Sequence, residues 1–188
     1  MILRAAAKVF AQSGFEAASM ADIAATAGVK KALVQYHFET KENLWRSAIA
    51  HLWAQRDEVL PALLDKLPSA DGKAALREIF LAIARFNRRH PEWIATLLRE
   101  SSVPGPRRDW LVENFLRNDM ERGTGFIEQA QLAGVLPTAA PLQLLHLISG
   151  ALFYNTLVAP ITADATGIDM ASDDALLQQV DLLLQLLQ

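Results

Sequence analysis

Residues 19–38 have the sequence SMADIAATAGVKKALVQYHF, the pattern of two short helices joined by a tight turn. Ser19 precedes a short apolar run and is followed three residues later by an acid, which is typical of a capped helix N-terminus. The run ends at Gly28, and the pattern predicts a second short helix over residues 29–36. Because the small Ala24 sits where the two helices would cross, the stretch predicts a helix-turn-helix.

The segments on either side of this motif also have helical periodicity. Residues 2–13 place apolar side chains on one face and stop at Gly14, and Thr40 is placed to cap a fourth helix that Pro61 and Pro68 would limit. We expect a small core made by Phe10, Phe15, Met20, Ile23, Val29 and Leu33.

This core would leave a polar face on the second helix of the motif, made of Lys30, Lys31, Gln35 and His37. In a major groove, lysine can neutralise phosphates or reach guanine, and glutamine can pair with adenine. Lys41 would add its charge to the N-terminus of the fourth helix, where backbone N–H groups can hold a phosphate. The spacing alone leaves a second interpretation open, in which the two helices only pack and the lysines are simply solvated.

The remainder of the chain is predicted to be helical as well, over residues 73–89, 92–102, 107–133, about 141–158 and 172–187. Gly123 and Gly125 weaken the expectation of one straight helix over 107–133. Residues 161–171 are expected to form a loop after Pro160. No strand alternation is present, so the sequence predicts an all-α fold of about nine helices.

Charge is distributed unevenly along the chain, although the whole chain carries only −3. Residues 1–56 carry seven basic and four acidic side chains, a charge of +3, whereas residues 57–188 carry eleven and seventeen, a charge of −6. Because association with DNA depends on the local patch, this distribution permits a DNA-binding N-terminal part on an acidic body.

Several other classes of protein find little support in the sequence. No run of about 18 uninterrupted apolar residues is present, so no membrane-spanning segment is predicted. The chain has no cysteine, its four histidines are widely separated, and it has neither a glycine-rich phosphate loop after a strand nor a nucleophile elbow. We therefore expect no enzyme, no metal site and no cofactor.

Residues 2–49 resemble the N-terminal domain of the TetR (tetracycline-repressor-like) family of bacterial regulators. The features that match are the opening ILRAAAKVFAQSGF, the helix and turn SMADIAATAGV, the ending YHF and the start TKENL of the fourth helix. The resemblance implies a helix-turn-helix DNA-binding domain at residues 1–48, and a helical ligand-binding and dimerisation domain at residues 49–188.

Carried over by position, the resemblance implies DNA contacts from Ser19, Lys30, Lys31, Ala32, Leu33, Gln35, Tyr36, His37 and Lys41. Lys30 replaces the usual small hydroxyl residue, Ala32 the common glycine and Gln35 the usual tyrosine, so a relative's operator sequence cannot be transferred. The basic arm that often precedes the first helix is expected to be absent or very short.

The implied function is that of a cytoplasmic, homodimeric regulator, a repressor released from a palindromic double-stranded operator by a small molecule, with no membrane partner. The last two helices would form the dimer interface. The effector is expected to have an apolar or aromatic body, with candidate contacts Arg85, Trp93, Glu100, Trp110, Asn114, Tyr154 and Asn155. For any one of these side chains, ordinary packing or surface exposure is a more common role than ligand contact. The alternative function is a helical ligand-binding or interaction protein that has lost DNA binding.

Overall fold

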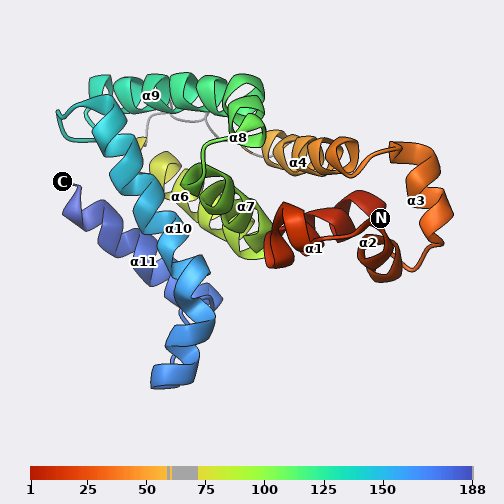
Figure 1. Ribbon diagram of the computed structural model, residues 1–188. Coiled ribbons are helices and arrows are strands. Elements are labelled where there is room, and N and C mark those ends of the chain that lie inside the picture. The colour runs from red at the N-terminus through yellow and green to blue at the C-terminus, as the bar shows by residue number, and fades with distance from the viewer. Residues whose placement is uncertain (59, 61–71, 188) are drawn as a thin grey trace. The chain divides into compact units, whose positions relative to one another are not determined.

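The computed structural model describes residues 1–58, 60 and 72–187, and this part of the chain contains helices and no strands (Figure 1). The predicted all-α fold is therefore confirmed for the described residues. Pro61 and Pro68, which were expected to limit the fourth helix, lie outside them.

The chain forms two compact units, each made of two separate segments. The N-terminal unit consists of residues 1–57 and 90–108, and the C-terminal unit of 58–89 and 109–188. The expected boundary after residue 48 falls inside one continuous helix, and residues 90–108 cluster with the N-terminal helices. A functional division at 48 stays a prediction.

The N-terminal unit is built from α1 (Ile2–Ala17), α2 (Met20–Thr26), α3 (Lys31–Phe38), α4 (Lys41–Asp57) and α7 (Pro91–Ser102). Helix α1 packs against α2, α4 and α7, and its small buried residues allow these helices to approach closely. Trp53 of α4 and Trp93 of α7 are both buried, with ring centroids 5.3 Å apart. This unit therefore has its own apolar core.

The predicted helix caps are confirmed. The Ser19 hydroxyl accepts a hydrogen bond from the Asp22 backbone N–H at 3.1 Å, and Thr40 Oγ1 accepts one from Asn43 at 3.0 Å. Such caps satisfy backbone donors that the first turn of a helix leaves unpaired.

The expected core position of Leu33 is wrong. Leu33 is 43% exposed, whereas its neighbour Val34 is fully buried. One residue corresponds to a rotation of about 100° around a helix, so a choice between adjacent apolar residues decides which face of α3 turns inward. Burial of Val34 leaves Leu33 on the outer face.

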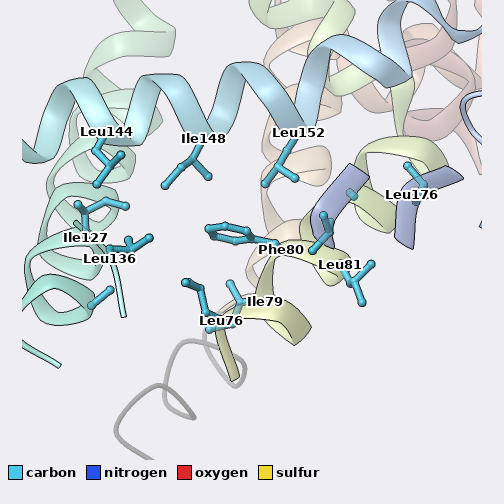
Figure 2. Packing of buried hydrophobic residues seen from close by; sticks show 13 residues of the cluster. Leu76, Ile79, Phe80, Leu81, Ile127, Leu136, Leu144, Ile148, Leu152 and Leu176 are labelled. Carbon is cyan, nitrogen blue, oxygen red and sulfur yellow. The ribbon is translucent and has the colours of Figure 1, made fainter. Parts of the chain in front are cut away.

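The C-terminal unit contains α6 (Gly72–Arg89), the end of α8 (Pro106–Leu111), the π-helical η1 (Val112–Leu116), α9 (Arg117–Leu132), α10 (Pro141–Thr166) and α11 (Asp173–Leu186). Its apolar core joins α6, α9, α10 and α11. Figure 2 shows Leu144, Ile148 and Leu152 along one side of α10, facing the Phe80 ring of α6. Ser172 Oγ caps α11 by accepting a hydrogen bond from the Ala175 N–H at 3.2 Å.

Two expectations for this unit are corrected. Helix α10 continues through Pro160 to Thr166 and ends at Gly167, whose φ of 74° suits a glycine after a helix. Pro160 removes one backbone donor but is exposed, and the helix continues beyond it. The irregularity predicted near the glycines of the long 107–133 segment occurs instead at the π-helical turn, Val112–Leu116.

Helix α10 is also long and apolar enough to cross a membrane, judged by length and composition alone. Only 22% of its most apolar 18-residue window is buried within this chain. A core helix or an interface helix meets the same criteria, so this is weak evidence for a membrane segment.

Gly123 and Gly125 should respond differently to alanine. A Cβ added at Gly125 would meet nothing within 4 Å, whereas one at Gly123 would lie 2.7 Å from Leu145 Cδ2. Alanine is better than glycine in a helix by about 1 kcal/mol. We therefore expect Gly125→Ala to raise the free energy of unfolding by about 0.5–1 kcal/mol, and Gly123→Ala to raise it less or lower it. Denaturant melts followed by circular dichroism measure both, and equal increases would contradict the packing of Leu145 on Gly123.

The ion pair between α6 and α11 should make stability depend on pH. Arg77 Nε and Nη2 donate to the two carboxylate oxygens of Asp181 at 2.5 and 2.9 Å. These hydrogen bonds, together with the charge of the guanidinium, lower the pKa of Asp181 below its usual value. A lowered carboxyl pKa gives stability that is present above the pKa of the unfolded state and lost as the pH falls through the folded pKa.

Asp181→Asn should therefore lower the melting temperature at pH 7. The difference in melting temperature between the variant and the wild type should shrink as the pH falls below about 4. Asp164→Asn, at an exposed carboxylate of α10, is the control. A difference that stays constant with pH would show that the ion pair does not contribute.

Candidate nucleic-acid interface

Helix α3 presents nearly all of its side chains to solvent. The exposed residues at its start and along its length are Lys30, Lys31, Ala32, Leu33, Gln35, Tyr36 and His37. Val34 is the buried exception, and Phe38 is half-buried. Seven of the nine predicted DNA contacts are thus brought together on one short helix.

The charge of this surface suits a polyanion. Two lysines lie at the start of α3, and the sequence has no acidic side chain from residue 23 to residue 38. Tyr36 is 81% exposed, and its ring lies edge-on to that of His37 at a centroid distance of 5.3 Å. Ring faces, an amide and two ammonium groups are therefore available to one partner.

The N-terminus of α3 lacks a side-chain cap. Lys30 occupies the capping position, and its side chain makes no capping hydrogen bond. A lysine has only donors, so it cannot accept from the backbone N–H groups of the first turn. These N–H groups stay on the same exposed end as the two lysines, where they favour an anion.

A tight turn connects α3 to α4. Glu39 has φ 59° and ψ −54°, and the Thr40 N–H donates to the Phe38 carbonyl at 2.5 Å, as in a γ-turn. Positive φ is uncommon for a residue with a Cβ and stores backbone strain. The angle between α3 and α4 therefore depends on the backbone of this two-residue turn, Glu39 and Thr40.

The two remaining predicted contacts, Ser19 and Lys41, are half-buried and already bonded within the chain. The Ser19 hydroxyl donates to Asp22 Oδ2 at 2.6 Å. Lys41 Nζ donates to the carbonyls of Glu16 at 3.2 Å and Ala18 at 3.1 Å. An ammonium has three donors, so these bonds leave Lys41 one donor for a phosphate. Sequence reasoning missed this internal role of Lys41.

The ligand candidates are not brought together in one place. Trp93 and Glu100 are buried on α7 in the N-terminal unit, and the other five lie in the C-terminal unit. Tyr154 is 63% exposed on α10, and Asn114 Nδ2 donates to the Trp110 carbonyl at 2.7 Å. Arg85 and Asn155 are half-buried. Ligand contact by these residues stays a prediction.

Metal ligands do not cluster in the described part of the chain: no group of three or more histidine, aspartate or glutamate side chains there could hold a metal ion.

Comparison with known proteins shows which proteins this segment of the chain is similar to. Residues 2–48 match the family model described as bacterial regulatory proteins, tetR family. Among curated proteins, the HTH-type transcriptional repressor NicS of Pseudomonas putida is 34% identical over 104 residues. That match covers 55% of this chain and 48% of NicS, so the chain spans about half the length of this relative.

Solved structures extend the likeness to the whole fold. A Clostridium perfringens protein assigned to the regulation of fatty acid metabolism superposes with a TM-score of 0.77 at 17% identity, covering 97% of this chain and 95% of that one. AibR, solved in complex with isovaleryl coenzyme A and operator DNA, superposes with a TM-score of 0.73 at 19% identity, covering 99% and 95%. At such identities these structures establish the fold alone. The helix-turn-helix segment is thus similar to bacterial regulatory proteins of the tetR family, and the whole chain has the fold of these solved regulators.

Proposed function

We propose that the chain is a transcriptional repressor that binds a palindromic DNA operator as a homodimer and is released by a small-molecule effector. The observation that carries the proposal is the outward face of α3, with two lysines, an amide and an exposed tyrosine and no acid among them. This surface has the chemistry that a helix needs in the major groove.

Within this interface the side chains divide into two roles. Gln35 can pair with adenine through both groups of its amide, and Lys31 can reach guanine acceptors or a phosphate. The α4 N-terminus, with the remaining donor of Lys41, would hold a phosphate and fix the position of the duplex. Base contacts would then determine which DNA sequence is bound, and phosphate contacts would determine where the protein lies along the duplex.

An exposed apolar surface supports dimerisation through the last two helices. The large exposed hydrophobic residues of α10 and α11 are Leu142, Leu147, Tyr154, Leu157, Ile161, Leu182 and Leu186. Exposed apolar surface of this extent is uncommon on a monomer and marks an interaction site. A twofold dimer would also place two α3 helices about 34 Å apart, one turn of DNA.

The proposal that a small molecule releases the chain from DNA is based on its structural similarity to regulators that bind small molecules. AibR was solved with both an acyl coenzyme A and operator DNA. An effector that binds more tightly to one conformation of the dimer would shift the population away from the DNA-binding form. The apolar lining expected of the C-terminal unit suits an effector with an apolar or aromatic body. Because a repressor acts on chromosomal DNA, the proposed location is the bacterial cytoplasm.

The first test is DNA binding itself. The purified protein is used to select fragments of bacterial genomic DNA, and its affinity for a selected fragment is measured across salt concentrations. A DNA-binding regulator should lose affinity with a log–log slope of about −0.9 for each phosphate neutralised. The alternative, a helical interaction protein without DNA binding, predicts no selected fragment and no such slope.

Lys30→Thr should separate stability from DNA binding. A threonine at the N-cap of α3 can accept a backbone hydrogen bond that Lys30 cannot, so the free energy of unfolding should rise by about 1 kcal/mol. The same change removes a cation from the interface, so affinity for the selected fragment should fall and the salt slope should become shallower by about 0.9. Lys73→Thr, at an exposed lysine of α6, is the control and should leave the slope unchanged. Unaltered affinity in Lys30→Thr would remove Lys30 from the interface.

Leu147→Glu should break the dimer. Leu147 is 69% exposed on α10, so the fold of one chain should tolerate a charge there. We expect a dimer in the wild type and a monomer in the variant by sedimentation, with at least tenfold weaker operator binding. Leu132→Glu, at an 89% exposed residue of α9, should stay dimeric. A monomeric wild type, or partition of the protein into membranes, would contradict the assignment of α10 to a dimer interface.

A further inference from the structure

Three cationic side chains from separate helices converge on the C-terminal end of α1. Gly14, with φ 77°, interrupts α1 and leaves carbonyls near its end without helical partners. Arg99 Nη2 of α7 donates to the Ala11 carbonyl at 3.4 Å, and Lys41 Nζ of α4 donates to those of Glu16 and Ala18. Cations are favourable at this end because the helix dipole is negative there.

The Phe15 ring lies at the centre of this cluster. Lys41 Nζ lies 4.5 Å and the guanidinium carbon of Arg107 4.1 Å from the ring centroid. Phe10 stacks on the ring at 5.9 Å, and Trp45 of α4 meets it edge-on at 6.5 Å. An aromatic face attracts cations within about 6 Å, so one ring holds the side chains of α4 and α8 together.

Two carboxylates fix Arg107 over the ring. Arg107 Nε donates to Glu100 Oε2 and Arg107 Nη1 to Glu16 Oε1, both at 3.3 Å. Glu100 is only 8% exposed, so its charge needs a partner. Glu16, by contrast, is exposed. The buried acid of α7 therefore determines where the guanidinium of α8 lies.

We infer that Arg107 is a positioning residue for DNA binding: held by Glu100, it orients Phe15, which in turn holds the Lys41 ammonium at the phosphate-binding end of α4. This inference rests on the proposed function and adds a residue that does not itself touch DNA. Arg107 lies at the start of α8, and the chain continues directly into η1 and α9 of the C-terminal unit. A shift of α8 would therefore change the geometry around Lys41.

The experiment measures affinity for a genomic fragment selected by the wild-type protein, over a series of KCl concentrations. Arg107→Gln leaves the Glu100 carboxylate buried without its cation, so the double variant Glu100→Gln/Arg107→Gln is made beside it to preserve folding. Thermal melts set a temperature at which every variant is folded. Arg117→Gln, at an exposed arginine of α9, is the matched control.

Both Arg107 variants should bind the fragment about tenfold more weakly and with a salt slope shallower by up to about 0.9, as in Lys41→Gln, because Lys41 is no longer held at its phosphate. Arg107→Lys keeps the charge but loses the planar guanidinium that reaches both carboxylates, so it should recover only part of the affinity. If Arg107 acts through Lys41, its loss should add little to the effect of Lys41→Gln, because coupled residues are non-additive.

Three results would overturn the inference while leaving DNA binding intact. They are wild-type affinity in the double variant Glu100→Gln/Arg107→Gln, a further loss of about 0.9 in the salt slope when Arg107→Gln is added to Lys41→Gln, which would mean a direct phosphate contact by Arg107, and additive effects on affinity with Lys41→Gln. A wild-type protein that selects no DNA would instead overturn the proposed function. The two failures are therefore distinguishable.

Discussion

A helix of eight residues is too short to persist alone in water, so the outer surface of α3 depends on the packing of its inner side. The fully buried side chain on that inner side is Val34, whose neighbours in the sequence are both exposed. Helix α3 packs on α2 and α4, and these in turn pack on α1. The proposed interface therefore depends on the small apolar core that α1, α2 and α4 form beneath α3.

Features that depend on neighbouring residues could be predicted from the sequence. The caps at Ser19 and Thr40 involve groups three residues apart, so the local sequence contains all of the necessary information. The choice of Val34 over Leu33 as the buried residue depends instead on the rotation of α3 against other helices. Both side chains are apolar, and composition cannot distinguish them.

Features that join distant segments could not be predicted. Phe15 and Arg107 are 92 positions apart, and neither lies in a recognisable motif with the other. Leu145 similarly packs where a side chain at position 123 would lie, which explains why a glycine is found there. From the sequence alone, Gly123 could only be read as a residue that weakens a helix. The passage of α10 through Pro160 shows that one unfavourable residue does not by itself end a helix. Lys41 has a feature of each kind. Its place at the start of a helix could be predicted from neighbouring residues, whereas its hydrogen bonds to carbonyls at the end of α1 join distant segments and could not.

The turn at Glu39 limits how the proposed DNA-binding surface can vary. Only Glu39 and Thr40 separate α3 from α4, and closing so short a connection forces a left-handed backbone at a residue with a side chain. A connection already at its minimum length has no slack, so α3 cannot swing on its own and must move together with α4. Insertion of even one residue between α3 and α4 would allow the two helices to change their relative orientation. We therefore expect descendants of this protein to vary in the side chains of the turn and not in its length.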